Sequence, residues 1–238
     1  MKIKDKIVAK ATDNNLAAPT IAFFGDSITQ GCFELIPRKE GGFDNVHDRE
    51  NVYHTRLVRL LAKQYPTVPI NVVNAGVAGT TASFGVERME RDVLSKNPDL
   101  TVVCFGLNDC GKEEAGLEEY VSSLSNIFDR LKDAGSEIIF MTQNMMCTQV
   151  SANIDPMFLK LANLLSVRQN RGVVDMYFEA AKKICLEKEI PVCDVYAKWK
   201  ALYEQGEDVT ELLSNKLNHP TREMHQLFAD SLYELMMR

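Results

Sequence analysis

The chain has 238 residues and a formal net charge of −6. This acidic balance argues against a nucleic-acid-binding protein, which would need a basic face. The apolar fraction of 45% and the charged fraction of 25% are those of an ordinary soluble globular protein. No apolar run approaches the roughly 20 residues that span a bilayer, so no membrane association is expected.

The first residues and the cysteines bear on the compartment. The opening MKIKDKIVAKATDNN has lysines but no sustained apolar core, unlike a secretory signal, so we expect a cytoplasmic protein. The six cysteines are scattered without a Cys-x-x-Cys pair. This favours free thiols over a disulfide framework, and a zinc site is not expected. We expect no cofactor and no metal.

In chain order, residues 1–18 are polar and are interpreted as an N-terminal arm or a short strand. The apolar run 21–24 stops at Gly25 and predicts a strand buried on both faces. Residues 32–51 look irregular and are expected to form a long loop over the site. His47 and His54 lie in or near this loop and are interpreted as surface histidines.

The rest of the chain alternates between predicted strands and predicted helices. A second buried strand is expected at 70–74, and further strands are expected at 99–105, 137–142 and 190–194. Helices are expected at 51–65, 86–94, 117–131, 157–170, 173–188, 195–203 and 227–235. Residues 143–156 are expected to form a polar loop that walls the site. This alternation predicts one domain over 1–238, a flavodoxin-like three-layer α/β/α sandwich with a five-stranded parallel sheet.

Small polar motifs follow the first three predicted strands, at Ser27, Gly79 and Asn108. The carboxyl ends of parallel strands meet at one edge of a sheet, where ligands bind. His219 lies on the last loop before the terminal helix. Acyl transfer needs a nucleophile, a base and donors for an oxyanion. Ser27 can be the nucleophile and His219 the base; the donors would be the N–H groups of Ser27 and Gly79 and the Asn108 amide.

These motifs together resemble the SGNH (GDSL-type) hydrolase superfamily. The sequence GDSIT resembles its nucleophile block, NAGVAGTT its second, GLND its third and NHP its last. Gly-Asp-Ser alone is ordinary turn chemistry, but four motifs in the family's order cover nearly the whole chain. The resemblance implies the fold predicted above and an esterase, lipase, thioesterase or carbohydrate deacetylase, typically without a metal. Asp26 and Asp109, within these motifs, are candidate substrate-binding residues.

One position departs from the family pattern. Members usually have an Asp shortly before the histidine to orient its ring, whereas this chain has Asn215 there. A Ser27–His219 dyad is one interpretation, with Asn215 or a backbone carbonyl as the orienting group. Glu211 or Asp208 supplying the acid is a second, and weak catalysis is a third. We favour the dyad and list Asn215 as a candidate catalytic residue.

The leading hypothesis is a serine esterase that removes a small acyl group, foremost acetyl, from a substrate such as a sugar. The expected partner is a small-molecule ester, with neither nucleic acid nor membrane; homo-oligomer formation stays open. The alternative is a catalytically weak or inactive protein of the same fold that binds a glycan or acyl ligand, which Asn215 favours. A nucleotide-binding flavodoxin-like or Rossmann protein is disfavoured, because the glycine spacing does not fit a dinucleotide fingerprint.

Overall fold

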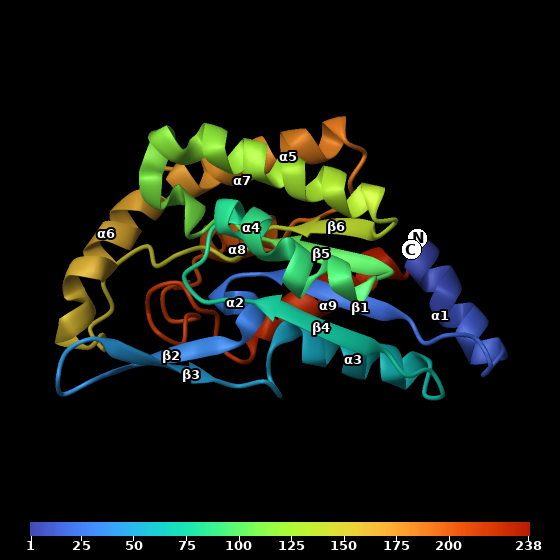
Figure 1. Ribbon diagram of the computed structural model, residues 1–238. Coiled ribbons are helices and arrows are strands. Elements are labelled where there is room, and N and C mark those ends of the chain that lie inside the picture. The colour runs from blue at the N-terminus through green and yellow to red at the C-terminus, as the bar shows by residue number, and fades with distance from the viewer.

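The computed structural model describes residues 1–238, and its centre is a five-stranded parallel sheet (Figure 1). The strand order is β4-β1-β5-β6-β7, the order of flavodoxin-like folds. The predicted fold class is confirmed. The strands are β1 (Thr20–Gly25), β4 (Asn71–Gly76), β5 (Leu100–Cys104), β6 (Glu137–Met141) and β7 (Val192–Cys193).

Helices cover both faces of this sheet. On one face, α3 (Tyr53–Gln64) packs against α9 (Met224–Met236), which also contacts α8 (Val195–Glu204). On the other face, α5 (Leu117–Asp133) packs between α4 (Ala82–Asp92) and α7 (Val173–Glu187). Helix α6 (Leu159–Asn170) contacts α7 and runs down past the end of the sheet, at the left of the view (Figure 1). Three short 3₁₀ segments complete the helices: η1 (Leu94–Lys96), η2 (Asp109–Gly116) and η3 (Pro156–Phe158).

The central strands are buried and one predicted buried strand is not. Residues 21–24 of β1 are fully buried, as are Val102 and Val103 of β5. The expectation of a buried strand at 70–74 is wrong, because β4 lies at the edge of the sheet and has a neighbour on one side only. Its Val72 is 40% exposed.

Residues 32–51, expected to form an irregular loop, contain an antiparallel hairpin. Its strands are β2 (Cys32–Pro37) and β3 (Phe43–His47). The hairpin reaches from the end of the short helix α2 (Ser27–Gln30) toward α6 (Figure 1). At its tip, the ring of Phe43 lies 5.7 Å from that of Phe158 in an edge-on contact.

The N-terminal segment is a helix, α1 (Lys2–Thr12), so the expected arm or strand is wrong. It is amphipathic and buries Ile3 and Ile7. The Glu137 carboxylate at the start of β6 accepts hydrogen bonds from the first backbone N–H groups of α1. Helix α1 therefore lies at the amino end of the strands, away from the end where Ser27 lies.

Two further findings concern the whole chain. All six cysteines are buried and unpaired. None of the helices combines the length and the apolar composition needed to cross a bilayer.

Candidate active site

The turn that carries Ser27 is built by a close approach of α2 to two strand ends. Asp26 caps α2, since its Oδ1 accepts a hydrogen bond from the Ile28 N–H at 3.0 Å. A Cβ on Gly25 would collide with the Thr29 side chain, and one on Gly76 with the backbone of Gln30. Only glycine at the ends of β1 and β4 lets α2 begin directly at the sheet edge, which places Ser27 there.

Ser27 and His219 meet although they are far apart in the sequence. The Ser27 Oγ lies 3.0 Å from His219 Nε2, and His219 Nδ1 lies 2.9 Å from the Phe33 carbonyl oxygen. A carbonyl oxygen can only accept, so Nδ1 carries the proton of the neutral ring. Nε2 is then the unprotonated nitrogen and accepts the Ser27 O–H. This is the tautomer that a general base needs.

The environment of His219 keeps its ring neutral. Burial lowers the pKa of His219 to about 4, while the hydrogen bond to the Phe33 carbonyl and the charge of Glu34 act in the opposite direction. Burial wins because desolvation disfavours the charged form of an imidazole. The ring is therefore an unprotonated base at neutral pH.

The four motif residues line one cavity of about 430 Å³: Ser27, Gly79, Asn108 and His219. The backbone N–H groups of Ser27 and Gly79 have no acceptor within the protein. Ser27 is buried and Gly79 is exposed, so only the Ser27 N–H is an unpartnered donor of the kind that is rare in protein interiors. Gly79 adopts φ +75°, a left-handed conformation that glycine favours. Two free donors beside a serine hydroxyl can bind the oxygen of a carbonyl group.

The Asn108 amide is held by a second network of buried groups. Its Nδ2 donates to Asp26 Oδ2 at 3.1 Å and to the Thr80 carbonyl at 3.0 Å. Gln143 Nε2 donates to the same Asp26 oxygen at 2.9 Å, and Gln143 Oε1 accepts from the Leu107 N–H. Both amide hydrogens of Asn108 are thus engaged, and a substrate oxygen would share or replace the Thr80 contact.

Asp26 and Asp109, the predicted substrate-binding residues, do not line this cavity. Both are buried, and burial raises the pKa of Asp26 to about 6 and that of Asp109 to about 7. Asp109 Oδ1 accepts a hydrogen bond from the Ala82 N–H at 2.8 Å, and its Oδ2 is buried without a partner. Asp26 instead accepts from the Ile28 N–H and from the Asn108 and Gln143 amides, and Asp109 accepts from the backbone only.

Asn215 does not reach the imidazole, so of the two orienting groups considered for the dyad, the Asn215 side chain is the wrong one. Its Oδ1 accepts from three backbone N–H groups, those of Leu217, Asn218 and His219, each at 3.0 Å. These bonds fold the loop that presents His219 and leave no lone pair for the ring. The backbone-carbonyl alternative is the one that the geometry supports.

The two other candidate acids are also paired elsewhere. Asp208 accepts hydrogen bonds from Gln149 and from the Thr210 N–H. Glu211 pairs with Lys216 at 2.8 Å and accepts from Ser151. Neither carboxylate contacts His219.

Several residues of the site were missed in the sequence. Gln143 lies two residues after the end of β6, just as Ser27 lies two residues after the end of β1, and this position is a signal that could have identified it. Arg88 donates to the Gly25 and Ala75 carbonyls at 2.7 Å, and so ties together the ends of β1 and β4. The Phe33 carbonyl had no signal, because a backbone group does not depend on residue type.

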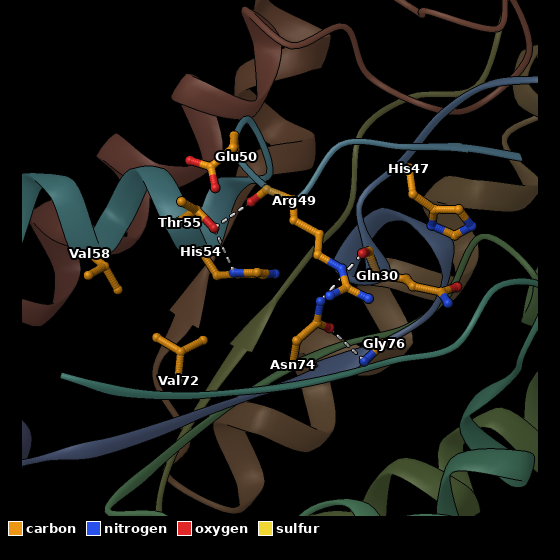
Figure 2. Close-up of a pocket in the computed structure, with 10 residues that line it drawn as sticks. All are labelled: Gln30, His47, Arg49, Glu50, His54, Thr55, Val58, Val72, Asn74 and Gly76. Atoms are coloured by element: carbon orange, nitrogen blue, oxygen red, sulfur yellow. Dashed lines mark hydrogen bonds between the residues drawn. The ribbon is translucent and has the colours of Figure 1, made fainter.

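A larger cavity of about 760 Å³ lies elsewhere, against the exposed edge of β4 (Figure 2). It is lined by Gln30, Arg49, His54 and neighbouring residues, and by none of the four motif residues. His54 is buried, contrary to the expectation of a surface histidine, and burial lowers its pKa to about 4. Its Nδ1 faces Thr55 Oγ1, and no serine, cysteine or metal-ligand cluster accompanies it. The residues expected to carry out catalysis therefore line the smaller cavity.

The fold and the four motif residues define the class of this protein, a parallel α/β protein of the SGNH hydrolase type. The sequence profile described as the GDSL-like lipase/acylhydrolase family matches residues 23–227, and the chain belongs to this family. The resemblance found in the motifs is confirmed. The expected enzyme class, carboxylic ester hydrolase of the GDSL type, is that of the family.

Individual relatives extend this finding. An acetylxylan esterase of Geobacillus stearothermophilus is 32% identical over 131 residues, which are 51% of this chain and 58% of that protein. The chain thus spans less than two thirds of this relative's length. The crystal structure of Axe2, an acetylxylan esterase of the same organism, is similar at 25% identity with a TM-score of 0.66 over 92% of this chain and 94% of the other. A two-domain esterase active on acetylated mannans shares the fold at 20% identity and a TM-score of 0.67, covering 98% of this chain and 52% of its own.

Proposed function

We propose that this protein is a serine esterase that removes acetyl groups from carbohydrates. The observation that carries the proposal is the 3.0 Å contact between Ser27 Oγ and His219 Nε2, with the tautomer of His219 fixed by the Phe33 carbonyl. The choice of acetyl and of a carbohydrate rests on the acetylxylan esterases to which the chain is similar.

In the first half of the reaction, Ser27 Oγ attacks the ester carbonyl carbon and its proton passes to His219 Nε2. The N–H groups of Ser27 and Gly79 stabilise the oxyanion, and the Asn108 amide contributes a third donor as its bond to the Thr80 carbonyl lengthens. The imidazolium then gives its proton to the leaving alcohol oxygen. The C–O bond breaks and leaves an acetyl group on Ser27.

In the second half, water replaces the alcohol. His219 takes a proton from the water, whose oxygen attacks the acetyl carbon, and the same proton then returns to Ser27 Oγ as acetate leaves. Asp26 and Gln143 act as positioning residues in this scheme, because they hold the Asn108 amide and do not meet the substrate. Asn215 likewise acts only by folding the loop that presents His219.

Hydrolysis of p-nitrophenyl esters of increasing chain length tests the proposal. We expect the highest kcat/KM with acetate, and labelling of Ser27 by a fluorophosphonate probe. Ser27→Ala should abolish labelling and lower kcat by at least about 10⁴-fold, the scale set by removing a catalytic serine elsewhere. Ser231→Ala, a change of the same type remote from the cavity, is the matched control. Wild-type rates in Ser27→Ala would refute the role of Ser27.

The second candidate is a protein that binds an acylated glycan without turnover. Two observations favour it: no carboxylate contacts His219, and both hydrogens of the Asn108 amide are already engaged. It predicts no fluorophosphonate adduct and a measurable dissociation constant for an acetylated oligosaccharide that is the same in wild type and Ser27→Ala. Probe labelling with release of acetate would exclude it.

A further inference from the structure

The catalytic cavity holds one charged side chain, Arg168. None of the residues that line the cavity is Asp or Glu, and His219, the other titratable group, is neutral at pH 7 because burial lowers its pKa to about 4. The polar lining also includes Asn45 and Asn218. Arginine stays protonated in proteins, so the cavity carries a net positive charge.

This guanidinium is almost without partners. Arg168 is only 8% exposed. Its one hydrogen bond runs from Nη2 to the Gly111 carbonyl at 3.2 Å, and its Nε is buried with no acceptor. No carboxylate lies within 4.0 Å of it, whereas Arg222 and Arg88 are both paired with acids. Of five N–H donors, four have no acceptor in the protein.

The helix that carries Arg168 faces the cavity along one side. Leu161, Leu165 and Arg168 of α6 all line it, and their spacing of four and three residues places them on one helix face. Gly111, which accepts the single hydrogen bond, also lines the cavity and lies three residues after Asn108. The guanidinium therefore belongs to the same wall of the cavity as an expected oxyanion donor.

The neighbouring acids do not neutralise this charge. Glu113 follows Gly111 by two residues, yet its carboxylate accepts from Arg171 Nη1 at 3.0 Å. Arg171 is one turn beyond Arg168 and is 52% exposed, so the exposed arginine is paired and the buried one is not. A buried, unpaired charge is costly for a fold, and an anionic group from outside the chain would compensate it.

We propose that Arg168 binds an anionic oxygen group of the substrate, so that the ester hydrolysed is an acetylated sugar bearing a carboxylate or a phosphate. This inference rests on the proposed esterase function and deepens it. A planar guanidinium matches both anions, which accept two parallel N–H bonds from it. The anion lies on the alcohol part of the ester, and its contact raises affinity without taking part in the bond changes at Ser27.

Three matched acetyl esters test the proposal: O-acetylated methyl glucoside, O-acetylated glucuronic acid and O-acetylated glucose 6-phosphate. We expect wild type to prefer at least one anionic ester over the neutral one by about 10- to 100-fold in kcat/KM, mostly through KM, the scale of a charge-assisted hydrogen bond. The ratio between the two anionic esters distinguishes carboxylate from phosphate.

Two variants locate the effect. Arg168→Gln should remove the preference while leaving hydrolysis of the neutral ester within a few-fold of wild type. Arg168→Lys keeps the positive charge but loses the pair of parallel N–H donors, and should retain part of the preference for the anionic esters. Arg171→Gln is the matched control and should leave the preference unchanged. If Arg168→Gln does not fold, the wild-type preference and Arg168→Lys decide the question.

A binding measurement separates this inference from the proposed function. Calorimetric titration of Ser27→Ala with glucuronate and with glucose 6-phosphate should show binding that Arg168→Gln in the same background weakens about tenfold or more. Such binding without any Ser27-dependent hydrolysis would refute the esterase and leave the anion site standing. Hydrolysis of the neutral ester with equal or higher kcat/KM than both anionic esters would refute the anion site and leave the esterase standing.

Discussion

Replacement of Asn215 distinguishes a residue that folds the His219 loop from one that orients the His219 ring. The Asn215 Oδ1 accepts from three backbone N–H groups at 3.0 Å, and Nδ2 donates to Asn218 Oδ1 at 3.1 Å. Two of the three donors belong to the buried residues Leu217 and His219. Asn215→Ala leaves these donors unpaired, at a cost of about 1–3 kcal/mol for each buried one.

We therefore expect Asn215→Ala to lower the free energy of unfolding by about 2–4 kcal/mol, allowing for partial access of water to the loop. In a chain of this size each kcal/mol shifts Tm by roughly 2–4 °C, so Tm should fall by about 4–16 °C. Urea unfolding followed by circular dichroism measures the change. Asn163→Ala, an exposed helical asparagine, controls for the substitution itself and should lie within about 0.5 kcal/mol of wild type.

Asn215→Asp separates the two roles. The carboxylate keeps acceptors for the three N–H groups and loses only the donation to Asn218, so stability should stay within about 1 kcal/mol of wild type. Because the new carboxylate still does not touch the ring, kcat should change by less than about tenfold, or 1.4 kcal/mol. A larger gain in kcat, toward the roughly 10⁴-fold by which a triad acid outperforms its amide, would refute the assignment of Asn215 to the loop.

Three further predictions concern titration and packing. As the pH falls, kcat/KM should decrease only near pH 4, well below 6.5, because His219 with its lowered pKa becomes protonated, and stops acting as a base, only near that pH. A pH–rate profile in which kcat/KM already falls at pH 6 or above would contradict this. Asp109→Asn should raise the free energy of unfolding by about 1–3 kcal/mol above pH 7 and should not raise it below pH 4, because a buried carboxyl with a raised pKa destabilises the fold once it is ionised. Equal changes in the free energy of unfolding at pH 4 and pH 8, measured by urea titration, would contradict this. Gly76→Ala should lower the free energy of unfolding by more than about 3 kcal/mol, because the new Cβ would collide with the Gln30 backbone. Gly111→Ala, whose Cβ would have no atom within 4 Å, should leave the thermal unfolding nearly unchanged.

The sequence predicted the sheet and its site-bearing edge because both depend on local patterns. Ser27, Gly79 and Asn108 follow strands whose apolar runs are unmistakable, and parallel strands deliver their carboxyl ends to one place. What the pattern could not give is the order of the strands. Residues 70–74 look like a buried strand in isolation, and only the pairing of β4 with β1 alone makes it an exposed edge.

The residues missed in the sequence are those whose role depends on tertiary contacts. The hairpin at residues 32–47 pairs over few residues, and its strands carry glutamate, proline and aspartate, so its pattern is weak. His54 is buried because α3 packs it against Phe23, whose ring lies 5.1 Å away. Arg168 has an ordinary place on a helix pattern, and only the tertiary structure reveals that its charge is buried and unpaired.

The hairpin resolves the absence of an acid beside His219. Arg222, on the same loop as His219, lies over the Phe33 ring at 4.5 Å and pairs with Glu34 and with Asp48. The loop and the hairpin are thus joined twice, through Arg222 and through the bond from His219 Nδ1 to the Phe33 carbonyl. This second bond fixes the ring tautomer, which is one of the two tasks of a triad acid.

The other task of such an acid is to stabilise the imidazolium, and here the site supplies less. The Phe33 carbonyl offers a dipole, and the Glu34 carboxylate acts on His219 only through space. Neither offsets the desolvation that lowers the pKa of His219 to about 4. A base of lower pKa accepts the Ser27 proton less readily but stays unprotonated in more acidic solution. Because a backbone carbonyl takes the place of the usual carboxylate, we expect a lower rate at neutral pH than a triad acid would give, together with activity that persists to lower pH.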